Sequence, residues 1–320
     1  MRHHHTSLLL PIERVALAYC LLTLLLMACF GSKLEHSGAM LLMRAEWAVL
    51  TMTAAALGQI CSRKAHEAVA TLRIIVQLAW LSQWYPDTYE FNRSLPSLDH
   101  LAARAEQWLF GCQPSLLMHR WLDGWAWSEA FNMGYFSYFP MIATLVACML
   151  ACRRLRPQAM HVATTLIAAF FIYYLIYIVL HVAGPQYYFC AIGIEAAQAG
   201  CFADIGTYFN THTQMLPLPG DADGLFHHLV EMAHQAGERP TAAFPSSHVG
   251  ISTIVMLFAR RHMPRLALLM LPLWLLLCGA TVYIQAHYLI DSIAGLISAP
   301  AVMWAAEKAA TSPLTLNQTT

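Results

Sequence analysis

The sequence predicts an all-α fold, a polytopic transmembrane helical bundle of about eight spans. The first observation behind this is composition: of 320 residues, 58% are hydrophobic and only 11% are charged, with a mean hydropathy of +0.50. Soluble globular domains carry about a quarter charged residues, so this chain is expected to have lipid as its solvent. The other two observations are long apolar runs and a basic character of alternate turns between them.

Long apolar runs recur along the whole chain, and about 20 apolar residues suffice to cross a bilayer as a helix. The runs lie near 15–31, 40–58, 66–84, 131–152, 162–183, 243–259, 266–284 and 287–306. The two weakest contain charged side chains, Arg44 and Glu46 in the second run and Arg73 in the third. Such residues face the bundle interior or the span edge. Six or seven spans fit the sequence as well, if either weak run lies flat or re-enters.

Basic residues predict the sidedness of the bundle. With the amino terminus in the cytoplasm, every short inner turn is basic, as shown by Arg14, Arg63, Lys64, Arg153, Arg154, Arg156, Arg260, Arg261 and Arg265. The two long outer segments, near 85–130 and 185–242, carry only four arginines. Both chain ends are therefore expected inside, and the stretches 239–250 and 281–291 are expected to meet at the non-cytoplasmic face.

The outer segments show no sign of a metal site or a nucleic-acid partner. The formal net charge is zero, and the nine cysteines lack CxxC or Cys/His metal spacing. Cys190 and Cys201 share one outer loop, where they either pair or stay reduced. The histidines of that loop are expected to be solvated: His212, His227, His228 and His234. Leu98 to Phe110 reads as an amphipathic helix at the membrane interface, either an aromatic anchor or the rim of a lipid entrance.

The first stretch with candidate catalytic residues is Phe244-Pro245-Ser246-Ser247-His248. Proline and serine are favoured at helix starts. Free backbone amides at a helix N-terminus, with the positive end of the helix dipole, form an anion site. The imidazole of His248 would stand beside a phosphate bound there.

The second stretch contains His287 and Asp291, which are four residues apart. On a helix this spacing puts both on one face, so Asp291 can orient the His287 ring. A carboxylate on one imidazole nitrogen fixes the tautomer and makes the other nitrogen a better nucleophile. We therefore expect one activated histidine and a second, His248, that protonates a leaving oxygen.

Phe-Pro-Ser-Ser-His followed about forty residues later by His-x3-Asp resembles the second and third signatures of the type 2 phosphatidic-acid phosphatase superfamily. The resemblance extends over roughly 180–300, including Gly184-Pro185-Gln186-Tyr187-Tyr188, and is closest to the inositol-phosphorylceramide-synthase-like (inositolphosphotransferase) branch. It implies metal-independent, cofactor-free phosphoryl transfer through a phosphohistidine. The roles that it implies are nucleophile for His287, its partner for Asp291, general acid for His248, and phosphate binding for Ser246 and Ser247.

The sequence departs from the common phosphatase pattern in its phosphate-binding cations. Ala280 and Thr281 stand where that pattern has Ser-Arg, and the first signature, a lysine followed by Arg-Pro, is absent. The synthase-like branch also lacks these arginines, so the departure favours that branch. Arg239 is the candidate replacement, and an ordinary loop arginine is an equally good interpretation of it.

These observations predict an integral membrane lipid phosphatase or phosphotransferase in a bacterial inner (plasma) membrane, with its active site on the non-cytoplasmic face. Its expected partners are a lipid phosphate substrate, an alcohol acceptor and membrane lipids, and no nucleic acid. We expect N-terminal spans and an interfacial segment in 1–130, a phosphatase or phosphotransferase membrane core in 131–308, and a tail in 309–320. Within the bundle of about eight spans, we expect a six-helix phosphatase-like core. The alternatives are a membrane transporter, although no broken helix pair or inverted repeat is visible, and a catalytically silent scaffold.

Overall fold

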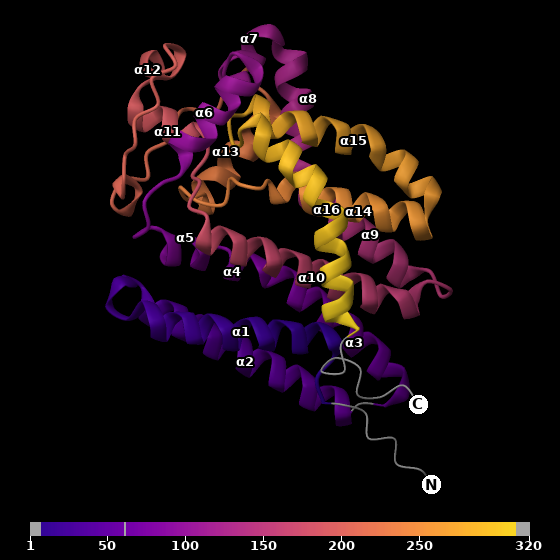
Figure 1. Cartoon of the computed structure of the whole chain (residues 1–320). Helices are drawn as coiled ribbons and strands as arrows, with labels where there is room; N and C mark the ends of the chain where they lie inside the picture. The colour runs from indigo at the N-terminus through magenta and orange to yellow at the C-terminus, as the bar shows by residue number, and fades with distance from the viewer. Residues whose placement is uncertain (1–7, 61, 312–320) are drawn as a thin grey trace. The chain divides into compact units, whose positions relative to one another are not determined.

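The computed structural model of the chain describes residues 8–60 and 62–311. These residues form α-helices and two short 3₁₀-helices and contain no β-strand, which confirms the all-α prediction (Figure 1). The helices are α1 (Pro11–Phe30), η1 (Gly31–Lys33), α2 (Ser37–Ile60), α3 (Arg63–Ala79), α4 (Leu81–Trp84), α5 (Pro86–Asn92), α6 (Asp99–Phe110), α7 (Pro114–Trp121), α8 (Trp125–Phe136), α9 (Tyr138–Ala151), α10 (Arg156–Val179), α11 (Pro185–Ile192), α12 (Ile194–Gln198), η2 (Tyr208–Asn210), α13 (Leu225–Gly237), α14 (Ser247–His262), α15 (Pro264–Tyr283) and α16 (Leu289–Ala310).

Within the described residues, five helices are long and apolar enough to cross a membrane: α1, α2, α10, α15 and α16. Helices α8 and α9, bent by 48° at their junction, together qualify as a sixth span. The remaining two predicted runs are the shorter helices α3 and α14, with 17 and 16 residues. Helix α14 is short because residues 243–246 form a loop that Ser246 ends as the N-cap, and Pro264 begins the next helix. The bundle is confirmed, with five or six candidate spans in place of about eight.

The chain folds into two compact units. Unit 1 contains Met1–Asp87, Val146–Ile172 and Ala301–Thr320, and unit 2 contains Thr88–Leu145 and Tyr173–Pro300. The domain boundaries predicted from the sequence, after residues 130 and 308, stay a prediction. Residues 312–320 of the predicted tail lie outside the described residues.

Two buried ion pairs link the helices of unit 1. Arg73 donates through Nε and Nη2 to the two carboxyl oxygens of Glu13, at 2.7 and 2.5 Å, and both side chains are almost fully buried. Arg44 donates to Asp87 at 2.8 Å. Buried charges are costly unless they are paired and hydrogen-bonded. The arginines in the two weakest predicted runs therefore face the interior of this unit, as expected.

In unit 2, α8 packs along α15, and α14 and α15 lie side by side (Figure 1). The α8–α15 contact is close because Gly134 lacks a side chain. Near the end of α15 the ring of Tyr283 stacks on that of Phe131 with centroids 4.7 Å apart. Tyr283 and Ala286 belong to the same buried apolar cluster. This packing fixes the point at which the chain leaves α15 toward His287.

The helix predicted at 98–110 is confirmed as α6, and its interfacial location stays a prediction. Its buried face combines Ala102 and Ala103 with the acidic Asp99 and Glu106, at helical spacing. Its other face leaves Trp108 82% exposed. An exposed tryptophan on an amphipathic helix fits the predicted interfacial location.

Two of the four histidines in the long outer loop are buried, although all four were predicted to be solvated. His212 and His228 are exposed, but His227 and His234 are buried. They are buried because α13 packs against α8, which turns one face of α13 inward. Cys190 and Cys201 are both free thiols.

The close α8–α15 contact predicts that Gly134→Ala destabilises the protein. A methyl group there would lie 2.7 Å from the carbonyl carbon of Leu276, so the helices would have to separate. Overpacking of this kind costs about 1–3 kcal/mol. The measurement is the thermal unfolding midpoint of the purified protein in detergent. Gly38→Ala in α2 is the matched control, because nothing lies within 4 Å of that position; equal midpoints for the two variants would contradict the packing.

Candidate active site

The loop before α14 and the first turn of that helix are held by buried hydrogen bonds. Ser246 is fully buried and caps α14, with its hydroxyl oxygen accepting from the amide of Val249 at 3.4 Å. The hydroxyl of Tyr177 donates to the carbonyl of Pro245 at 2.8 Å and accepts from the amide of Ser247 at 2.9 Å. Two of the donors predicted for a bound anion are therefore engaged within the protein.

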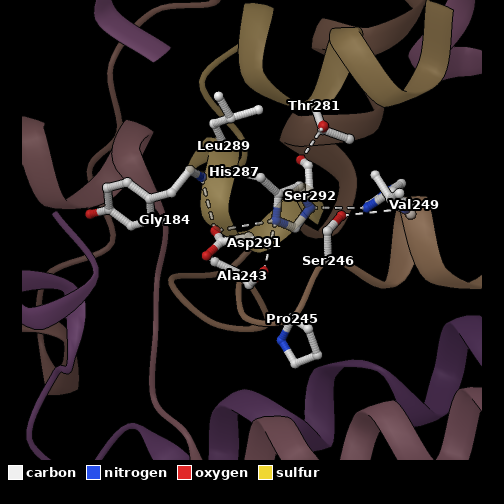
Figure 2. Close-up of polar contacts among 12 residues, drawn as sticks. Gly184, Ala243, Pro245, Ser246, Val249, Thr281, His287, Leu289, Asp291 and Ser292 are labelled. Carbon is white, nitrogen blue, oxygen red and sulfur yellow. Dashed lines mark hydrogen bonds and ion pairs between the residues drawn. The ribbon is translucent and has the colours of Figure 1, made fainter. Parts of the chain in front are cut away.

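His287 lies in the short loop between α15 and α16, close to His248 and Asp291. Its Nε2 is 3.4 Å from Nδ1 of His248. Its Nδ1 is 2.8 Å from the carbonyl oxygen of Ala243 and 3.7 Å from Oδ2 of Asp291. Figure 2 shows both of these Nδ1 contacts as dashed lines. The three residues predicted from two separate stretches of sequence are thus in contact.

The hydrogen bond to Ala243 determines the tautomer of His287. A carbonyl oxygen can only accept, so Nδ1 carries the hydrogen and Nε2 presents its lone pair toward His248. The sequence assigned this orienting role to Asp291. Oδ2 of Asp291 instead accepts from the amide of Tyr288 at 2.9 Å and faces Nδ1 at ion-pair distance. The carboxylate hydrogen-bonds to the amide of Tyr288 because Tyr288 directly precedes α16 and Asp291 lies in the first turn of that helix.

Aromatic rings fix the orientation of His248. The ring of Tyr135 stacks on it with centroids 4.6 Å apart, and the ring of Tyr138 lies at 4.5 Å. His234 from α13 packs edge-on against Tyr135 at 6.0 Å. Burial lowers the pKa of His234 to about 4, so this ring is neutral at physiological pH. It acts as a packing group and adds no charge beside His248.

Backbone hydrogen bonds join the three segments that converge on the histidines. The amide of Ala243 donates to the carbonyl of Val182, and the amide of Gln186 donates to that of Gln285, each at 2.9 Å. Gly184 lies between these bonds with φ of 98°, and a methyl group there would overlap the carbonyl of Ala286. Only glycine fits at this position. The Gly184-Pro185 segment therefore forms part of the site's scaffold.

Asp99, which the sequence did not single out, organises that scaffold. Its carboxylate is fully buried and accepts from the amides of Ala183 and Gly184, each at 2.8 Å. The hydroxyl of Tyr288, next to His287, also donates to it at 3.2 Å. Burial raises the pKa of Asp99, while the two amides and the hydroxyl of Ser97 oppose that shift.

Glu106, a second buried acid on α6, caps the helix that carries Asp291. Its Oε1 accepts from the amide of Leu289 at 2.5 Å, and its side chain is fully buried. Burial, followed by the nearby charge of Asp291, raises the pKa of Glu106 to about 8. The signal that could have identified both acids is their spacing: Asp99 and Glu106 are seven residues apart on the otherwise apolar face of α6.

Arg239, the candidate phosphate-binding cation, is exposed, and its Nη1 donates to the carbonyl of Glu238 at 3.0 Å. No hydrogen bond among the described residues joins it to His248, His287 or Ser246. Burial raises the pKa of Glu238 to about 7, and the charges of His287 and Arg239 oppose this shift. An exposed arginine and a carboxyl that is partly protonated near neutral pH are therefore neighbours in the chain shortly before α14.

A family model described as the PAP2 superfamily matches residues 101–305. The chain belongs to the PAP2 superfamily. Comparisons with curated proteins and with solved structures found no match. PAP2 superfamily members are generally phosphatases, so membership and the long apolar helices together identify an integral membrane protein of the phosphoryl-transfer class. The match contains Glu106 as well as His248, His287 and Asp291.

The raised pKa of Glu106 predicts a pH-dependent difference in stability between the wild-type protein and Glu106→Gln. The unfolded carboxyl ionises near pH 4.5, whereas the folded one keeps its proton to about pH 8. Wild-type stability relative to the variant therefore falls as pH rises through this window, by at most about 1.4 kcal/mol per pH unit, and is constant above it.

Thermal unfolding of both proteins between pH 5 and pH 9 measures this difference. Glutamine keeps an oxygen that accepts from Leu289 and cannot ionise, which makes it the matched comparison. A difference in midpoint that does not change with pH would show that Glu106 is ionised in the folded protein.

Proposed function

We propose that this PAP2 superfamily protein is a lipid phosphatase or phosphotransferase that acts through a phosphohistidine on His287. The observation that supports this most strongly is the pair of histidines, with Nε2 of His287 3.4 Å from His248 and Nδ1 held by a carbonyl. The substrate is a lipid phosphate or phosphodiester. The basic inner turns favour a location of this site on the non-cytoplasmic face of its membrane, which we propose is a bacterial inner membrane.

In the first step of the proposed reaction, the lone pair of His287 Nε2 attacks the phosphorus atom. The bond between phosphorus and the lipid oxygen breaks, and that oxygen takes a proton from His248. The phosphoryl group must lie between the two rings for this step. Substrate binding therefore replaces the 3.4 Å contact between them.

In the second step, water or an alcohol attacks the phosphohistidine and gives its proton to His248. The phosphorus–nitrogen bond breaks, and Nε2 of His287 recovers its lone pair. His248 thus acts as acid in the first step and as base in the second, which leaves it unchanged after each turnover. From a phosphomonoester, water yields inorganic phosphate and an alcohol yields a new phosphomonoester. From a phosphodiester, whose second ester bond stays on the transferred group, water yields a phosphomonoester and an alcohol yields a new phosphodiester.

Positive charge develops on the His287 ring as Nε2 bonds to phosphorus. The carbonyl of Ala243 accepts from Nδ1, and the carboxylate of Asp291 lies 3.7 Å from the same nitrogen. Both are in place before the reaction, so they stabilise this charge without reorganising. In this proposal Asp291 acts by electrostatics and by fixing the loop through Tyr288.

The phosphate oxygens are proposed to lie at the N-terminus of α14, near Ser246 and Ser247. The positive end of the helix dipole favours an anion there. Arg239 is the proposed cation, since its exposed side chain is free to turn from the Glu238 carbonyl toward a bound phosphate. Its charge would also favour the ionised form of Glu238.

We propose that the protein belongs to the inositolphosphotransferase-like branch because of the residues that precede His287. Ala280 is fully buried, and the hydroxyl of Thr281 is 2.8 Å from that of Ser292, also buried. These positions pack against neighbouring helices and offer no cation to a phosphate. A site with little positive charge fits a phosphodiester, which carries less negative charge than a phosphomonoester.

Replacing either histidine is predicted to abolish turnover. His287→Ala removes the nucleophile and should lower kcat by at least about 1000-fold. His248→Ala removes the general acid and should lower it by about 100- to 10,000-fold. Turnover by purified protein, measured as release of phosphate or of a phosphomonoester and as formation of a new phosphoester, over a panel of lipid phosphates and lipid phosphodiesters with and without an alcohol acceptor, tests this. His228→Ala is the control, because that ring is exposed and pairs only loosely with Glu231.

Turnover by His287→Ala at the wild-type rate would contradict the proposal. Lipid or ion flux in liposomes that does not depend on either histidine would favour a transporter. Absence of turnover by the wild-type protein over the whole panel would favour a silent scaffold. In the panel itself, phosphate release identifies a phosphatase, and a new phosphoester that appears only with alcohol identifies a transferase.

Arg239→Ala is predicted to weaken substrate binding more than it slows the chemical step. The side chain is exposed and makes no contact with either histidine among the described residues. We expect KM to rise about tenfold, the effect of losing one charge-assisted hydrogen bond, with a smaller change in kcat. Arg120→Ala, another exposed outer arginine, is the control. Equal values of KM and kcat for the two variants would show that Arg239 is an ordinary loop arginine and does not bind the substrate phosphate.

A further inference from the structure

Unit 1 contains a cavity of about 570 Å³ between α3 and the turn that joins α9 to α10. Its apolar wall includes Ile74, Leu150 and Met160, and its polar side includes Arg153, Arg156 and Glu67. None of these residues takes part in the proposed phosphoryl transfer. A cavity that combines apolar walls with two guanidinium groups suits an amphipathic anion.

Arg156 is held at the cavity by two hydrogen bonds. Its Nη1 donates to Oε2 of Glu67 at 2.9 Å, and its Nε donates to the carbonyl of Leu150 at 2.9 Å. The charge of Glu67 balances that of Arg156, so Arg153 supplies the excess positive charge. Arg153 is exposed, and no hydrogen bond or ion pair to its guanidinium occurs within the described part of the chain.

The cavity lies where membrane-spanning helices reach the membrane surface. Arg156 is the first residue of the candidate span α10, and Ala151 is the last residue of the bent candidate span α8–α9. The turn between them, with Arg153, Arg154 and Arg156, is therefore expected at the level of the lipid headgroups. Basic residues at this level attract anionic lipids. A phospholipid would place its phosphate near the arginines and its first acyl carbons against the apolar wall.

We propose that this cavity binds one anionic phospholipid, with Arg153 contacting the headgroup phosphate. The site is separate in sequence and chemistry from the catalytic histidines. Arginine suits this role because its planar guanidinium matches two phosphate oxygens at once. The lipid would bind there as a structural ligand and not as a substrate.

Arg153→Ala tests the proposal, since the exposed guanidinium of Arg153 makes no hydrogen bond or ion pair within the described residues. Arg154→Ala is the matched control: it lies in the same turn, is also exposed and does not line the cavity. Binding of phosphatidylglycerol, phosphatidylcholine and inorganic phosphate to the full-length protein in detergent is measured by native mass spectrometry, with a thermal midpoint for each variant.

We expect phosphatidylglycerol to bind the wild-type and Arg154→Ala proteins alike, and about tenfold more weakly to Arg153→Ala. Equal binding by all three proteins would overturn the proposal. Equal binding of phosphatidylcholine and phosphatidylglycerol would overturn the anionic preference, and inorganic phosphate binding as tightly as the lipid would overturn the lipid assignment. Because the assay needs no turnover, its outcome is independent of whether His287 is the nucleophile.

Discussion

The hydrogen bond from His287 Nδ1 to the carbonyl of Ala243 is the interaction on which the candidate site depends. It joins two stretches of chain 44 residues apart. It brings His287 to the first turn of α14, where His248 lies, and leaves Nε2 as the nitrogen with the lone pair. The loop that carries His287 is also tied to α11, because the amide of Gln186 donates to the carbonyl of Gln285. The loop before α14 is tied to α16, because the amide of Ser246 donates to the carbonyl of Asp291, so the rings have one defined arrangement. The chemistry proposed for the protein follows from that arrangement.

Buried carboxyl groups stabilise this loop in an apolar protein. Asp99 binds the amides that follow α10, Glu106 binds the start of α16, and Asp291 binds the amide of Tyr288. Buried acids are costly unless hydrogen-bonded, and here each accepts from backbone amides that would otherwise lack partners. The proton retained by Glu106 near neutral pH avoids two adjacent buried charges. One helix, α6, therefore supports both the segment that follows α10 and the loop that carries His287.

Much of the site could be predicted from the sequence because its chemistry resides in side chains with diagnostic spacing. His248, His287 and Asp291 were found in this way, and the structure brings them together. The Ala243 carbonyl could not be found, since every residue has one and only the fold selects it. Asp99 and Glu106 were missed because they occupy the buried face of a helix interpreted as interfacial. At 66–84 and 243–259 the helices are shorter than the predicted runs, because α3 gives way to α4 at Trp80 and Ser246 caps α14, and apolar composition does not reveal such helix ends.

The most direct test of this account is the position of the phosphoryl group on the trapped enzyme. After rapid quenching with labelled lipid phosphate, peptide mass spectrometry and ³¹P NMR identify the modified histidine and the modified nitrogen. Phosphate is expected on Nε2 of His287, because Nδ1 is occupied by its hydrogen bond to the Ala243 carbonyl. Phosphate on Nδ1 of His287, or on His248, would contradict it.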